Sequence, residues 1–174
     1  MTQSISHVVL PGTYDPVTLG HVDVIRRASR LFSRVTVGVA ASRSKRGVGT
    51  VFTLDQRVAM IEESLLEQGI EGVDVRPFEG LLVDFCREVG AGGVVKGLRA
   101  MTDFEYELQQ ADLNAHLAPD LESVFVMASP SYGYVSSSIV RELASLGSPV
   151  DGLVPKCVAN HLCDRYDHAE ADAK

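Results

Sequence analysis

The stretch VVLPGTYDPVTLGH, residues 8–21, begins with three apolar residues, continues through a glycine-containing loop and ends where a helical pattern starts. This order predicts a strand, a tight loop in which Gly12 takes unusual dihedrals, and a helix that Gly20 opens without a side chain. In an open parallel sheet such a loop lies at the carboxyl edge, where ligands bind, and a helix N-terminus favours anions. The stretch therefore indicates a phosphate site. A plain glycine turn is the alternative, and neither a Walker loop nor a GxGxxG motif is present.

Short apolar runs rich in valine recur along the chain, each followed by a loop and a helical pattern. The runs are Val8–Leu10, Val35–Ala41, Val73–Phe78, Val94–Val95 and Val124–Met127. Because their apolar character hardly alternates, we expect strands that are buried on both faces, which requires helices above and below a parallel sheet. The sequence thus predicts a doubly wound, Rossmann-like α/β fold with five parallel strands. One domain is expected over residues 1–166, and residues 167–174 are expected to form a disordered tail.

Helix ends carry their own signals. Thr53 with Gln56, and Thr102 with Glu105, have the spacing of capping boxes, in which each side chain bonds an otherwise unpaired backbone N–H. Gly90 suits the left-handed residue just past a helix. For the helix after the fourth strand, the apolar spacing predicts a buried face of Phe104, Leu108, Ala111 and Ala115.

Composition limits the classes of function. The 174 residues carry a net charge of −7, which argues against a nucleic-acid partner because phosphate neutralisation needs surplus Lys and Arg. Cys86, Cys157 and Cys163 form no CxxC pair, so neither a disulfide framework nor a zinc site is expected. The sequence shows no signal-peptide pattern and no apolar run of about eighteen residues, so we expect no membrane partner and a cytoplasmic location.

Two motifs in the expected order carry a family resemblance. TLGH, residues 18–21, resembles the TxGH form of the HxGH signature of the nucleotidyltransferase superfamily related to class I aminoacyl-tRNA synthetases. VSSSIVR, residues 135–141, resembles its ISSTxxR signature. PGTYDPVTLGH, ASRSKR, VKGLRAMTDFEYE and YGYVSSS together resemble bacterial phosphopantetheine adenylyltransferases, from about Val8 to about Leu162.

The resemblance implies transfer of AMP from ATP to 4′-phosphopantetheine with Mg²⁺, giving dephospho-coenzyme A and pyrophosphate. It also implies a homohexamer and leaves open feedback binding of coenzyme A. The motifs offer donors and cations and no serine or cysteine paired with a base. A direct in-line attack by the substrate phosphate fits this chemistry, since nucleotidyl transfer needs positioning more than a protein nucleophile.

Site roles follow from the same resemblance. His21, Thr13, Lys45 and Arg99 are implied as catalytic, with His21 donating a hydrogen bond to the α-phosphate of ATP. The implied ATP contacts are Thr13, Tyr14, His21, Gly97, Leu98, Arg99, Glu107, Tyr132, Gly133, Tyr134, Val135, Ser136, Ser137 and Ser138. The implied phosphopantetheine contacts are Thr13, Lys45, Leu82 and Lys96. No protein ligand is assigned to the metal, which the ATP phosphates are expected to hold.

Plainer roles exist for several of these residues. His21 and Ser136 could cap helices, Glu107 could be a solvated carboxylate, and Arg141 could serve either a phosphate or an ion pair. Lys96 stands where many family members have arginine, so the charge is kept and the bidentate fork is lost.

Other functions compete with this interpretation. Within the superfamily, a nicotinamide mononucleotide adenylyltransferase and a glycerol-3-phosphate cytidylyltransferase are alternatives, against which the GLRA and DFEYE segments argue. A non-catalytic sensor of ATP or coenzyme A would be expected to have lost His21 or Arg141, and both are present.

Overall fold

The computed structural model describes residues 5–41, 49–99 and 101–171, with side chains described except at 101–103 and 167–171. Its sheet has five parallel strands in the order β3-β2-β1-β4-β5. They are β1 (His7–Gly12), β2 (Arg34–Ala40), β3 (Val73–Phe78), β4 (Gly93–Leu98) and β5 (Glu122–Met127). The winding reverses between β1 and β4, which confirms the predicted doubly wound sheet.

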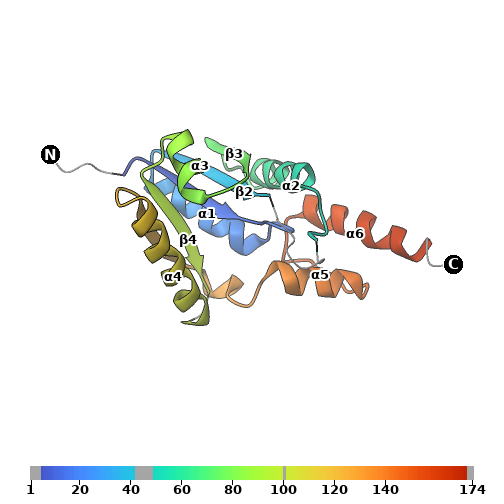
Figure 1. Ribbon diagram of the computed structural model, residues 1–174. Coiled ribbons are helices and arrows are strands. Elements are labelled where there is room, and N and C mark those ends of the chain that lie inside the picture. Colours follow the sequence, from blue (N-terminus) through green and yellow to red (C-terminus); the bar gives the residue numbers. More distant parts are fainter. Residues whose placement is uncertain (1–4, 42–48, 100, 172–174) are drawn as a thin grey trace.

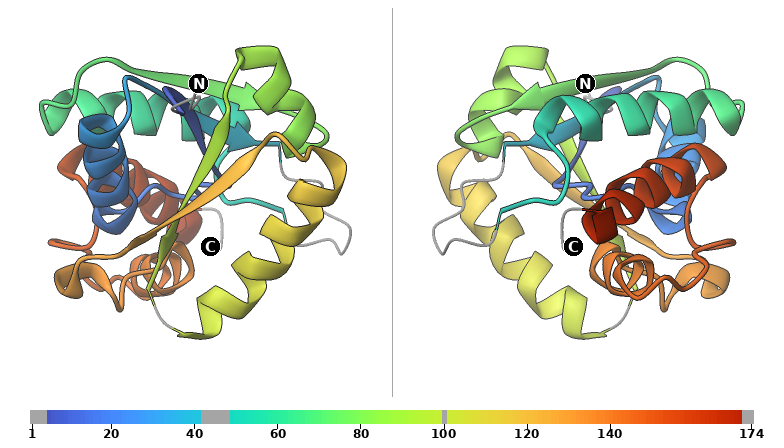
Figure 2. Two further views of the ribbon diagram at one scale, coloured as in Figure 1. Left: turned by 90° about the vertical axis from the view of Figure 1, so that its left-hand side faces the viewer. Right: turned by 90° about the vertical axis from the view of Figure 1, so that its right-hand side faces the viewer.

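Helices cover both faces of the sheet (Figures 1 and 2). They are α1 (Leu19–Leu31), α2 (Leu54–Glu67), α3 (Leu82–Val89), α4 (Met101–Leu117), α5 (Ser137–Ser145) and α6 (Lys156–Ala171), with a short 3₁₀ helix η1 (Pro130–Tyr132) before α5. One core cluster joins β1 and β2 to α1, α2, α5 and α6, and the other joins β1 and β4 to α3. In the part of the chain that is described, no helix is long and apolar enough to cross a membrane.

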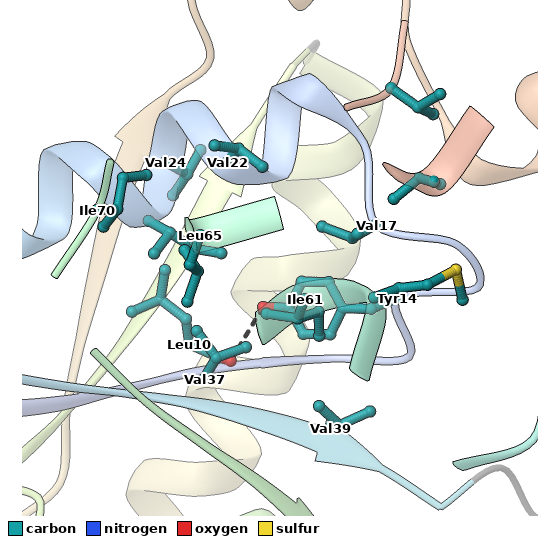
Figure 3. Close-up of a cluster of buried hydrophobic side chains, with 14 of the residues drawn as sticks. Leu10, Tyr14, Val17, Val22, Val24, Val37, Val39, Ile61, Leu65 and Ile70 are labelled. Carbon is teal, nitrogen blue, oxygen red and sulfur yellow. Dashed lines mark hydrogen bonds between the residues drawn. The ribbon is translucent and has the colours of Figure 1, made fainter. Parts of the chain in front are cut away.

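Side chains along β1 alternate between these two cores. Val8 and Leu10 belong to the cluster under α1 and α2, whereas Val9 belongs to the one under α3. Figure 3 shows Leu10 with Val37 and Ile61 in the first cluster. This two-sided burial explains why the strand is apolar at consecutive positions.

Several helix ends follow the sequence and one does not. The Thr53–Gln56 capping box starts α2, and Gly90 ends α3 with φ 71°, both as predicted. Thr102 is not an N-cap, because α4 begins at Met101 and already includes it. A further capping box, Thr18 with His21, starts α1.

The buried face of α4 also differs from the prediction. Leu108 and Ala115 are exposed, whereas Glu107, Gln110 and Asn114 are partly buried. The last three line a narrow gap between α4 and strands β4 and β5. Phe104 and Ala111 are partly buried, as predicted, and Phe104 lies edge-on against Phe125, so the apolar spacing identified only part of the inner face.

The C-terminal helix is longer than expected. α6 continues to Ala171, so residues 167–171 are helical where the sequence predicted a tail without regular structure (Figure 1). The domain boundary at residue 166 stays a prediction.

Gly97 in β4 allows α1 to lie close to the sheet. A Cβ at this position would lie 2.9 Å from Cγ2 of Val24, a buried side chain of α1. A methyl group there would therefore push α1 away from the strand.

We expect Gly97→Ala to lower the free energy of unfolding by about 1–3 kcal/mol, the usual cost of overpacking a core. Most of that loss should disappear in a Val24→Ala background, where the clashing methyl is gone. Gly92→Ala is the matched control, because its Cβ would meet no atom closer than 4.0 Å. Urea unfolding of wild type, Gly97→Ala, Val24→Ala, the double variant and Gly92→Ala measures these differences. An equal cost of Gly97→Ala in both backgrounds would contradict the close approach.

Candidate active site

A cavity of about 490 Å³ lies at the carboxyl ends of β1 and β4, where the winding reverses. It is lined by Pro11, Gly12, Thr13, Thr18, Gly20, His21, Val24, Lys96, Gly97, Arg99, Tyr106, Glu107, Ala128, Tyr132, Val135, Ser136, Ser137 and Ser138. Its position follows the rule that open α/β sheets bind ligands at the switch point, and its size suits a small molecule.

Most of the residues expected from the sequence meet here. Thr13, His21, Lys96, Gly97, Arg99, Glu107, Tyr132, Val135, Ser136, Ser137 and Ser138 all line the cavity. Tyr14, Leu98, Gly133 and Tyr134 do not appear in its lining, so any contact of theirs with ATP stays a prediction. Lys45 lies outside the described residues.

His21 both caps α1 and faces the cavity. Its Nδ1 accepts a hydrogen bond from the backbone N–H of Thr18 at 3.0 Å, while the Thr18 hydroxyl accepts one from the His21 backbone N–H at 3.4 Å. An Nδ1 that accepts leaves the ring proton of a neutral imidazole on Nε2. The cap and the predicted catalytic role therefore do not compete, because the cap fixes the tautomer that can donate.

Charge and burial keep the His21 ring neutral. Burial, and secondarily the positive charge of Arg99, lower the pKa of His21 to about 4. Arg99 itself donates from Nη1 to the carbonyl of Val135 at 3.1 Å, which ties the end of β4 to the segment before α5. At neutral pH the site thus offers a neutral donor beside a fixed cation.

The loop after β1 is shaped by Tyr14. This residue has φ 50°, and its hydroxyl donates to the carbonyl of Leu10 at 3.0 Å (Figure 3). Its ring lies edge-on to that of His21, with centroids 5.1 Å apart. The sequence assigned the unusual dihedrals to Gly12, which is not among the residues with positive φ. Gly12 is needed instead because a Cβ would lie 2.8 Å from the Tyr14 ring.

Arg57 of α2 also binds this loop, a contact that the sequence analysis did not predict. It is only 2% exposed, and Nη1 donates to the carbonyls of Thr13 at 2.6 Å and Ala40 at 2.9 Å. Burial lowers the pKa of Arg57 below its ordinary value, and the negative charge of nearby Asp15 opposes part of this shift. A charged residue among Met60, Ile61 and other apolar positions of one helix face was the available signal, since such residues are almost never buried without partners.

The start of α5 forms another wall of the cavity. Ser136 is its N-cap, accepting from the Ile139 N–H at 3.2 Å, so the plain capping role is confirmed and coexists with a place in the lining. Ser137 donates from Oγ to the carbonyl of Pro16 at 2.8 Å. Arg141 makes an ion pair with Asp15 and does not appear in the lining of the cavity.

Lys96 stands between two cavities. Its Nζ lies 3.2 Å from Oε2 of Glu107, so the two residues form an ion pair and Glu107 is not a solvated carboxylate. A second cavity, of about 280 Å³, shares Lys96 and Tyr106 with the first and is lined further by Leu82 and other residues of α3 and α4. The predicted acceptor contacts Lys96 and Leu82 therefore lie on adjoining surfaces.

The described residues contain no group of three or more His, Cys, Asp or Glu side chains that could hold a metal ion. Glu107 is the one carboxylate in the described lining, and it is already ion-paired with Lys96. The site therefore fits a hydrated metal that a nucleotide brings with it better than a metal held by protein alone.

Fold and site together define a nucleotidyltransferase. Residues 9–143 match the family model described as cytidylyltransferase-like. Two crystal structures of a bifunctional NMN adenylyltransferase/ADP ribose pyrophosphatase from Francisella tularensis share the fold, with TM-scores of 0.71 and 0.68 at 16% identity. Each superposes on 94% of this chain, which spans half the length of that protein.

A curated relative gives the narrower assignment. The phosphopantetheine adenylyltransferase of Moorella thermoacetica is 50% identical over 158 residues, which cover 91% of this chain and 96% of that protein. The chain belongs to the phosphopantetheine adenylyltransferases, within the cytidylyltransferase-like family.

The capped tautomer predicts how His21 titrates. In the free protein its ring should gain a proton only near pH 4 and stay protonated on Nε2 alone at neutral pH. Ring ¹⁵N chemical shifts followed against pH measure both properties. A midpoint near the ordinary value of 6.5, or a neutral ring carrying its proton on Nδ1, would contradict the geometry.

Stability should follow the same titration. Between about pH 6.5 and pH 4 the unfolded chain binds a proton at His21 that the folded protein does not, so the free energy of unfolding falls as pH is lowered through this window. Burial also lowers the pKa of His7, which acts in the same direction. The free energy of unfolding, measured by urea unfolding between pH 4 and pH 7, should fall less steeply in His21→Gln than in wild type.

Proposed function

We propose that this chain transfers AMP from ATP to 4′-phosphopantetheine, giving dephospho-coenzyme A and pyrophosphate, as a step of coenzyme A biosynthesis. The observation that carries the proposal is the pair of adjoining cavities that share Lys96 and Tyr106. One is bordered by cations, hydroxyls and a helix N-terminus, as a nucleotide requires. The other is lined in part by apolar side chains, Leu81, Leu82, Val83, Leu113 and Leu117, along which a pantetheine arm could lie.

ATP occupies the larger cavity in this proposal. The Nε2–H of His21 donates to the α-phosphate, where charge builds up in the transition state, and Arg99 adds a fixed positive charge. Backbone and hydroxyl groups around Ser136 at the start of α5 bind the rest of the nucleotide. Glu107, which is ion-paired with Lys96 at the wall of this cavity, takes a ribose hydroxyl or the hydrated metal.

The acceptor enters from the smaller cavity. Its pantetheine arm lies along Leu82, and its phosphate lies at Lys96 and Thr13, with Lys45 as a further contact. An oxygen of this phosphate attacks the α-phosphorus in line, a new P–O bond forms, and the bond to the β-phosphate bridging oxygen breaks, so pyrophosphate leaves with that electron pair. No residue is adenylylated, and the protein acts by alignment and charge.

Mg²⁺ accompanies ATP in this proposal. When bound to the phosphates it neutralises charge on the leaving pyrophosphate. One of the Francisella tularensis structures is described as complexed with AMP and a manganese ion. The chain's own contribution is Glu107 and the cations, and no direct protein ligand is proposed.

Assembly and regulation belong to the proposal as well. α4 exposes four large apolar side chains, Tyr106, Leu108, Leu113 and Leu117, between 40% and 62%, and all of them except Leu108 also line the smaller cavity. We propose the homohexamer that the resemblance implies. Coenzyme A shares the pantetheine arm and would bind the same cavities as a feedback ligand. A cytoplasmic location is proposed, supported by Cys86, Cys157 and Cys163, which are all free thiols.

The direct test is pyrophosphate release from ATP and Mg²⁺ with and without 4′-phosphopantetheine. Nicotinamide mononucleotide with ATP, and glycerol 3-phosphate with CTP, are the parallel acceptors. Release that depends on phosphopantetheine is expected. Release only with another acceptor would assign the chain to a different transferase. Tight nucleotide binding with no release in any mixture would make it a sensor.

His21→Gln separates the two roles of the histidine. A glutamine at this position can keep the capping box, as Gln56 does by accepting from the Thr53 N–H at 3.0 Å. The single-turnover rate of transfer should fall roughly 10²-fold with little change in ATP affinity, because the imidazole acts chiefly in the transition state.

Gln56→Ala removes the corresponding side chain of the α2 capping box and shows what damage to a cap away from the cavity does. It should cost about 1 kcal/mol of stability and leave the transfer rate unchanged. Equal losses of ATP binding and rate in His21→Gln would instead make His21 a ground-state ligand.

A further inference from the structure

Asp15 connects the loop after β1 to the residues just before α2. The residue follows Thr13 and Tyr14 in the loop, and its carboxylate is 7% exposed. Oδ2 accepts from the N–H of Val51 at 2.9 Å, and Oδ1 accepts from the N–H of Phe52 at 3.0 Å. A carboxylate with both oxygens bonded to backbone N–H groups is fixed in place. The loop after β1 cannot shift without breaking these bonds.

Arg141 holds the same loop from the opposite side. From α5 its Nη1 donates to the carbonyl of Asp15 and lies 3.6 Å from the Asp15 Oδ2. The adjacent hydrogen bond from Ser137 to the carbonyl of Pro16 strengthens this link. Arg141 is 30% exposed, yet it does not line the cavity. Arg141 of α5 therefore contacts the loop after β1 and does not contact the cavity that ATP would occupy.

We propose that Asp15 and Arg141 are positioning residues of the transfer reaction. They form a clamp that holds the Gly12–Pro16 loop before substrates bind, so that Thr13 and His21 keep their geometry toward the phosphates. The proposal rests on the proposed transfer to phosphopantetheine. Its physical reason is that displacement of an aligning group by about 1 Å can cost 10²-fold in rate.

Two other roles for Arg141 make different predictions. As a ligand of the ATP phosphates it would set KM for ATP. As a purely structural ion pair it would set the unfolding midpoint and leave the rate of folded enzyme unchanged. If Arg141 and Asp15 act together as a clamp, substitution of either residue lowers the rate of the chemical step in enzyme that is still folded.

The test is a double-mutant cycle of Asp15→Asn, Arg141→Gln and the double variant. Single-turnover rates and KM for ATP are measured at a temperature where circular dichroism shows every variant folded. We expect each single variant to lose roughly tenfold to 10²-fold in rate, with KM for ATP within about threefold of wild type. The double variant should lose no more than the worse single variant, because both remove the same clamp.

Conservative and matched variants complete the design. Arg141→Lys keeps the charge, should recover part of the rate, and serves as the readout if Arg141→Gln does not fold. The exposed pair Arg34–Asp74, 3.3 Å apart at the other end of the sheet, is the control. Arg34→Gln and Asp74→Asn should leave the rate unchanged.

Three results would overturn the proposal. They are a large rise of KM for ATP at an unchanged rate, an unchanged rate in folded variants, and rate losses that multiply in the double variant. Failure of the proposed function is distinguishable, since wild type itself would then release no pyrophosphate with phosphopantetheine.

Discussion

The hydrogen bond from the Thr18 backbone N–H to Nδ1 of His21 connects the fold to the chemistry. It completes the N-terminal cap of α1, the helix that packs against β2 and β4. The same bond places the ring proton on Nε2, and burial beside Arg99 keeps the ring neutral. A helix end that any α/β protein needs thereby also becomes a hydrogen-bond donor facing the cavity.

The loop before this cap is held by groups from far along the chain. Arg57 from α2 binds the Thr13 carbonyl, Asp15 binds the lead-in of α2, and Arg141 from α5 binds Asp15. These contacts are buried or partly buried, so they keep their strength better than exposed pairs do. Contacts from α2 and α5 therefore hold this loop in place.

The sequence predicted the repeated strands and the residues within the family motifs. Valine runs predicted the parallel sheet because two-sided burial demands unbroken apolar strands. The family resemblance carried by TLGH, VKGLRA and VSSSIVR predicted most of the cavity lining. Phosphate-binding motifs are local, so they can be read without knowing the tertiary contacts.

Other features depend on contacts between distant segments. The burial of Arg57 breaks the apolar pattern of its helix and is explained by the carbonyls of Thr13, in the loop after β1, and of Ala40 in β2. Leu108 faces outward because α4 turns Glu107 toward Lys96. Gly12 is required by the ring of Tyr14 two residues later, a contact that no propensity encodes.

The most direct measurement is a crystal structure with a non-hydrolysable ATP analogue and Mg²⁺. The account predicts an α-phosphate oxygen about 2.7–3.1 Å from Nε2 of His21, with Nδ1 still accepting from Thr18 and the Gly12–Pro16 loop unmoved. An α-phosphate bound away from His21, or a loop that rearranges and releases the Thr18 bond, would contradict it.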